Sequence, residues 1–124
     1  SHCFSADVNA AFDPIYGEVH ERRNASYINY GVVVTKYTGA RGKAGTNDAT
    51  AEMMGFARRI LDAEHVGWQT GELGKVGTVA MYVSQHNIDT VDLGVPVLSM
   101  HAPFEVVAKA DVYMTYRAMR AFYK

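Results

Sequence analysis

Two residues of this 124-residue chain combine metal-binding chemistry with a suitable position, namely Asp7 and His101. Each follows an apolar run, residues 3–6 for Asp7 and residues 95–100 for His101, and both runs are typical of short buried strands. In open α/β sheets, ligands and metals gather beyond the carboxyl ends of the strands. A carboxylate oxygen and an imidazole nitrogen are together common ligands of zinc and similar cations. The pattern predicts half of a metal site, although His101 serving only to end the strand-to-helix turn is an alternative.

The elements that must position these two residues alternate between strands and helices along the chain. The β-branched and apolar runs predict strands over residues 1–8, 30–37, 67–70, 90–93 and 95–100, with Asp7 at the end of the first. Apolar residues at spacings of three and four predict helices over residues 48–64, 78–86 and 105–124, the last one broken near residues 110–111. Such alternation predicts a three-layer α/β sheet within a single domain.

The side chains expected in the core follow from the helical period. In the first helix they are Met53, Phe56, Ala57, Ile60 and Leu61. In the second they are Val79, Tyr82 and Val83. In the last helix Val112, Tyr116, Met119 and Tyr123 keep the helical period. Thr46, Asn47 and Asp48 are the candidate caps of the first helix. Gly94 and Pro96 are expected to separate the last two strands.

Four stretches of the chain resemble one family of metallopeptidases. They are SADVNAAFDP (residues 5–14), VTKYTG (34–39), WQTGELGK (68–75) and SMHAPFE (99–105), and they occur in the family's order over nearly the whole chain. The resemblance is to the aspartyl aminopeptidase family, which includes vacuolar aminopeptidase I. It implies a three-layer α/β/α zinc-peptidase sheet of the phosphorylase/hydrolase-like type, of which residues 1–124 are the C-terminal part. The N-terminal part of the catalytic domain and the lid or dimerisation domain are expected to lie elsewhere in the polypeptide.

The resemblance also implies a mechanism in which two zinc ions activate water and hydrolyse the N-terminal residue of a peptide. By that likeness Asp7 binds one ion and His101 binds the other. The remaining ligands and the general-base Glu match nothing in this chain and are expected upstream, so the chain by itself is expected to be inactive. No catalytic residue is assigned within it.

The family likeness also suggests roles for further residues, and alternatives to these roles stay open. Lys36 matches a lysine near the substrate pocket, or is a solvated lysine at a strand end. Glu105 orients the imidazole of His101, or favours the N-terminus of the last helix. Lys43 stands where acid-selective relatives carry a Tyr, which leaves the preferred N-terminal residue open. Between Val76 and Gly77 this chain lacks the Asp and glycine run of related sequences, through a deletion or because the sequence as given omits a loop.

The composition narrows the possible partners. Twelve basic and thirteen acidic residues give a net charge of −1, with no basic patch that would support nucleic-acid or anionic-membrane binding. No apolar run approaches the ~18 residues of a membrane span. The single Cys3 fits a reducing compartment, so a cytoplasmic location is expected.

Two rival functions stay open at this point. One is the related metal-dependent amidohydrolase or deacetylase chemistry, and the other is a non-catalytic α/β module for binding or assembly. The family resembled forms dodecamers, so a homo-oligomer is expected, in contact with the remainder of its own catalytic domain. Exposed apolar surface is expected on residues 32–34, 95–100 or 112–123.

Overall fold

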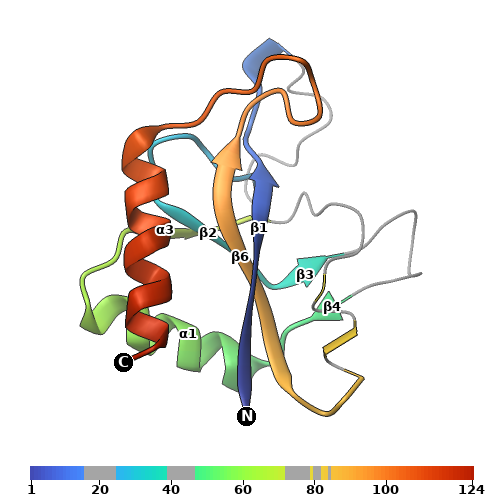
Figure 1. The fold of residues 1–124 in the computed structure, drawn as a ribbon, viewed down its shortest axis with the longest axis vertical. Helices are drawn as coiled ribbons and strands as arrows, with labels where there is room; N and C mark the ends of the chain where they lie inside the picture. Colours follow the sequence, from blue (N-terminus) through green and yellow to red (C-terminus); the bar gives the residue numbers. More distant parts are fainter. Residues whose placement is uncertain (16–24, 39–46, 72–78, 80–81, 84) are drawn as a thin grey trace.

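A computed structural model describes residues 1–15, 25–38, 47–71, 79, 82–83 and 85–124 of the chain. These residues form strands and helices in a mixed arrangement, which confirms the predicted α/β class (Figure 1). The strands are β1 (His2–Ala10), β2 (Val32–Thr35), β3 (Tyr37–Thr38), β4 (Asn47–Asp48), β5 (Trp68–Thr70) and β6 (Asp89–Val97). The helices are α1 (Ala51–Ala63) and α3 (Lys109–Phe122).

The main sheet has the strand order β1-β6-β2-β5, and β3 pairs with β4 in a separate two-stranded sheet. β1 and β6 are parallel over nine residue pairs, from His2↔Asp89 to Ala10↔Val97. β2 is antiparallel to β6 and parallel to β5. The carboxyl ends of β1 and β6 therefore lie at one edge of the sheet, whereas β2 runs in the opposite direction and its last residue, Thr35, pairs with Asp92 in the middle of β6.

β6 is one continuous strand, whereas the sequence predicted two strands with a break at Gly94 and Pro96. β2 pairs with β6 only at residues 92–94, so Pro96 lies beyond that ladder and its missing N–H interrupts no bond to β2. Gly94 pairs with Asp7 of β1 and with Val33 of β2. The prediction of a break was wrong, because Gly94 and Pro96 both lie within the continuous strand β6.

The helices α1 and α3 pack against one face of the main sheet (Figure 1). Met53, Ala57 and Leu61 of α1 are buried, as the helical period predicted. α1 begins later than predicted, and its cap is Thr50, whose side chain accepts a hydrogen bond from the Met53 N–H. The core cluster joins residues of both helices to apolar side chains of β1, β2 and β6: Phe4, Val32, Val34, Ala49, Met53, Ala57, Leu61, Val66, Val91, Leu93 and Ala118.

The last helix differs from its prediction in its start and in having no break. It runs without a break from Lys109, and its buried residues are Asp111, Ala118 and Ala121. Of the residues that keep the helical period, Val112, Tyr116 and Tyr123 are exposed, while Met119 is half-buried. Apolar residues occur on more than one side of this helix, so the period alone did not determine which side faces the sheet.

Asp111 explains the orientation of α3. Its side chain is 1% exposed, and its carboxylate accepts hydrogen bonds from the Asn29 N–H at 2.6 Å and the Gly31 N–H at 2.9 Å. Gly31 has a φ of +97°, and a Cβ there would lie 2.1 Å from the Gly67 carbonyl oxygen. The carboxylate thus fastens the N-terminal turn of α3 to the loop that leads into β2.

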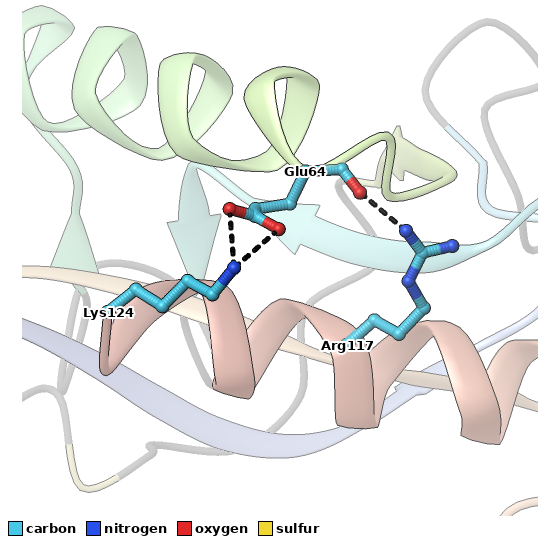
Figure 2. Close-up of polar contacts among 3 residues, drawn as sticks. All are labelled: Glu64, Arg117 and Lys124. Atoms are coloured by element: carbon cyan, nitrogen blue, oxygen red, sulfur yellow. Dashed lines mark hydrogen bonds and ion pairs between the residues drawn. The ribbon is translucent and has the colours of Figure 1, made fainter.

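A second polar link joins the C-terminal ends of the two helices (Figure 2). The Glu64 carbonyl oxygen, at the end of α1, accepts from Arg117 Nη2 at 2.5 Å. The Glu64 carboxylate pairs with Lys124 Nζ, 3.1 Å from each oxygen. These contacts set the relative position of α1 and α3.

The opposite face of the main sheet carries mostly polar side chains. Because side chains alternate along a strand, Ser5, Asp7 and Asn9 point away from the face that Phe4 and the helices occupy. Ser5 pairs with Asp92, and both are buried. One sheet therefore has an apolar face under the helices and a polar face that includes Asp7.

The exposed apolar surface differs in part from the prediction. Residues 32–34 are fully buried, whereas α3 does expose Val112, Tyr113, Tyr116 and Tyr123. Val79 and Tyr82 were expected to point inward, but they are 66% and 62% exposed. Among the described residues, no helix is long and apolar enough to cross a membrane.

Candidate metal centre

Asp7 lies on β1, at the level of Gly94 of β6. It is exposed, and its Oδ1 accepts a hydrogen bond from the Val8 N–H at 2.7 Å. β1 continues to Ala10, so Asp7 stands three residues before the strand ends and not at the end itself. The residues before and after Asp7 are therefore both paired with β6.

Gly94 fixes the main chain of Asp7, a role that the sequence reasoning missed. A Cβ at Gly94 would lie 1.3 Å from the Asp7 carbonyl oxygen and 2.4 Å from its carbonyl carbon. Only a glycine allows this approach of the two strands. An isolated glycine inside an apolar run is a known sign of close backbone contact, and that sign was available in the sequence.

His101 lies in a loop that continues directly from β6. Leu98 and Val106 close the loop with two main-chain hydrogen bonds, Leu98 N–H to Val106 O at 2.9 Å and Val106 N–H to Leu98 O at 3.1 Å. Ser99 and His101 have φ values of +57° and +68°. Left-handed conformations of residues other than glycine cost about 1–3 kcal/mol each, so other contacts must hold this loop. The His101 side chain is exposed.

Glu105 supplies one of those contacts. Its Oε1 accepts a hydrogen bond from the His101 main-chain N–H at 2.6 Å. α3 begins only at Lys109, so the predicted position of Glu105 at the start of the last helix was wrong. The carboxylate is bonded to the backbone of the histidine and belongs to the loop that carries it.

Asp7 and His101 belong to neighbouring parallel strands, since Asp7 lies on β1 and His101 lies in the loop that follows β6. β1 and β6 are parallel neighbours, and the loop after Val97 extends beyond their carboxyl ends (Figure 1). Among the described residues, no group of three or more His, Cys, Asp and Glu side chains is placed to hold a metal ion. The carboxylate and the imidazole are nonetheless a ligand pair that zinc accepts.

Lys36 directly follows the last residue of β2. Thr35 pairs with Asp92, so Lys36 follows β2 toward the amino-terminal end of β6. Its Nζ is 2.5 Å from Asp48 Oδ1, and both side chains are exposed. It lines a hollow of about 420 Å³ with Ala51, Met54, Gly55, Arg58 and Trp68. The role of Lys36 in substrate binding stays a prediction.

A buried polar network lies on the same face as Asp7. Asn9 Nδ2 donates to Thr35 Oγ1 at 2.9 Å, and Ser26 Oγ lies 3.0 Å from Asn9 Oδ1 and 2.9 Å from the Ala10 carbonyl oxygen. All three side chains are buried. These bonds join the end of β1 to the end of β2, and no local sequence pattern predicted them.

Cys3 lies on β1, the strand that carries Asp7. Partial burial, and to a lesser extent the charge of Asp92, raise the pKa of the Cys3 thiol above its usual value of 9.0. Lys43 and residues 72–78, which include the Val76–Gly77 junction, lie outside the described residues.

Comparisons with known proteins all point to one protein family. The family model described as aminopeptidase I zinc metalloprotease (M18) matches residues 1–123. A probable M18 family aminopeptidase 1 of Clostridium acetobutylicum is 49% identical over 127 residues, covering 98% of this chain and 27% of the relative. The chain therefore spans about a quarter of the length of that relative.

Solved structures match the fold as well. The crystal structure of aminopeptidase I from Clostridium acetobutylicum superposes with a TM-score of 0.92 at 48% identity, covering 99% of this chain and 28% of that one. The mApe1 dodecamer of S. cerevisiae has a TM-score of 0.75 at 22% identity, covering 97% of this chain and 26% of that one. The second likeness concerns the fold alone.

Proposed function

Because the chain belongs to the aminopeptidase I zinc metalloprotease family (M18), we propose that the full-length protein removes N-terminal residues from peptides with zinc as its metal. The observation that carries the proposal is that Asp7 lies on one strand of a parallel pair and His101 lies in the loop that follows the other strand. This segment contributes part of the site, and the other ligands and the general-base Glu come from the rest of the polypeptide.

In the proposed site, Asp7 binds one of two zinc ions and His101 binds the other. Bound zinc polarises a carbonyl oxygen and lowers the pKa of water near neutrality. The task of this chain is to hold one anionic oxygen and one neutral imidazole nitrogen at fixed positions, since zinc ligands must be deprotonated. If the two ligands serve neighbouring ions, their side chains lie about 6–9 Å apart.

The proposal extends to assembly and location. We propose a homo-oligomer, and the exposed Val112, Tyr113, Tyr116 and Tyr123 of α3 support it, because a partner usually covers apolar side chains that gather on one helix. A cytoplasmic location is supported by Cys3, the chain's one cysteine, which cannot form a disulfide within this chain.

The proposal is tested with His101→Ala and Asp7→Ala in the full-length protein. Each change is expected to lower the zinc content, measured by mass spectrometry after dialysis, and to remove nearly all hydrolysis of a peptide with a free N-terminus. His65→Ala is the control for the first change, because His65 is also exposed and has a φ of +53°. Asp89→Ala at the start of β6 is the control for the second.

Three results would overturn the proposal or redirect it. Full zinc content in both variants would refute the ligand assignment. Loss of zinc with wild-type activity would refute the role of the metal in hydrolysis. Cleavage of N-acylated amides in place of free N-terminal peptides would favour the deacetylase-type alternative.

A further inference from the structure

We propose that Glu105 is a positioning residue for His101, acting through the main chain and not through the imidazole ring. The inference rests on the proposed function, in which His101 is a zinc ligand. Its starting point is the hydrogen bond of 2.6 Å between the His101 N–H and Glu105 Oε1. A charged acceptor makes this kind of bond about twice as strong as a neutral one.

The loop needs such a contact because its backbone is unfavourable. Ser99 and His101 both have left-handed φ values, although neither is a glycine. The hydrogen bonds between Leu98 and Val106 close the base of the loop, and the Ala102 N–H donates to the Ser99 carbonyl oxygen at 3.0 Å. Neither contact involves the His101 N–H, which bonds to Glu105. The carboxylate therefore restrains the one residue whose side chain is proposed to bind metal.

The position of Glu105 in sequence argues against a role in helix α3. The helix begins at Lys109, and its N-cap Ala108 makes no side-chain capping bond. The acidic residue in its first turn is Asp111, whose carboxylate binds the Asn29 and Gly31 N–H groups. The contact of Glu105 thus lies within the His101 loop, where it determines the direction in which the Cα–Cβ bond of residue 101 leaves the backbone.

A metal ligand requires this kind of restraint. Bond lengths to zinc vary by only a few tenths of an ångström, whereas a change in φ at residue 101 rotates the whole imidazole about the backbone. Groups that orient a ligand typically change metal affinity by about 10–100-fold when removed. We expect Glu105 to act in this range even though it bonds to the backbone.

The test compares Glu105→Ala with Glu105→Gln in the full-length protein. Ala removes the acceptor, whereas Gln keeps an oxygen at the same position without the charge. We expect Glu105→Ala to lower zinc affinity about 10-fold or more in a chelator competition, and Glu105→Gln to stay within about threefold of wild type. In the metal-free protein, hydrogen–deuterium exchange of a peptide covering residues 98–106 should be faster in Glu105→Ala and near normal in Glu105→Gln.

Two controls separate positioning from general stability and from the ligand assignment. Thr50→Ala removes another side-chain acceptor of a main-chain N–H, at the cap of α1, and should leave zinc affinity and exchange at residues 98–106 unchanged. His101→Ala removes the proposed zinc ligand and so tests the ligand assignment. If His101→Ala retains zinc, the proposed function fails first. If His101→Ala loses zinc but Glu105→Ala binds it normally, or if Thr50→Ala weakens zinc binding as much as Glu105→Ala does, the positioning role of Glu105 is refuted.

Discussion

The same strands form both faces of the main sheet, but apolar packing stabilises one face and buried hydrogen bonds stabilise the other. Under the helices, Phe4, Val34 and Leu93 pack against α1 and α3 without polar partners. On the other face, Asn9 and Thr35 are buried and joined by a hydrogen bond. Apolar packing tolerates small shifts of its members, whereas hydrogen bonds require their partners at fixed distances. The polar face, which carries Asp7, is therefore the face on which position matters most.

The largest expected effect is on the apolar face. Leu61→Ala removes a fully buried side chain and should lower the free energy of unfolding by about 2–5 kcal/mol. Denaturant unfolding of the full-length protein measures the loss, and zinc content of the folded fraction should be unchanged. Loss of zinc from protein that stays folded would contradict the expected difference between the two faces.

Gly94→Ala tests the point where β6 touches Asp7. The added Cβ would lie 1.3 Å from the Asp7 carbonyl oxygen, so the strands must separate, at a cost of about 1–3 kcal/mol. Unlike Leu61→Ala, this change should also weaken zinc binding, because Asp7 moves. Gly55→Ala is the matched control, since nothing lies within 4 Å of a Cβ at that helical position. Normal zinc binding in Gly94→Ala would show that Asp7 is not held through this contact.

Asn9→Ala sharpens the comparison within the polar face. It leaves Thr35 and Ser26 without their bonds to Asn9, which should cost about 1–2 kcal/mol. The free energy of unfolding measures this cost, and the double variant Asn9→Ala/Thr35→Val should recover part of it. No recovery would mean that the two side chains do not act as a pair.

The smallest effect is expected at the link between the helices in Figure 2. Lys124→Ala breaks an ion pair whose side chains are 55% and 40% exposed, and such pairs contribute about 0–1 kcal/mol. The change should be smaller still at 1 M salt, because salt screens exposed charges. A loss above about 2 kcal/mol would contradict this reading of the pair.

Sequence reasoning predicted the parts of this molecule that depend on local pattern. The spacing of Met53, Ala57 and Leu61 predicted the buried side of α1, and the apolar run before Asp7 predicted β1. Strand direction follows from contacts distant in sequence, so the antiparallel pairing of β2 with β6 was not predicted.

The same limit applies to single residues near the candidate site. Gly94 appeared to end a strand because its contact with Asp7 joins residues far apart in the chain. Asp111 is a polar residue turned toward the interior, so the apolar period did not indicate the buried side of α3. The bond between Glu105 and the His101 N–H depends on left-handed backbone at residues 99 and 101, which the residue types there do not indicate.

The order of the strands has a consequence for synthesis on the ribosome. β1 and β2 are made early, but in the finished sheet β6 lies between them. Until residues 89–97 have left the exit tunnel, neither strand has the neighbour that completes its pairing, and both present open hydrogen-bonding edges. Assembly of the sheet must therefore wait for the C-terminal third of this chain. A nascent chain stalled before β6 is expected to need chaperone protection that the complete sheet does not.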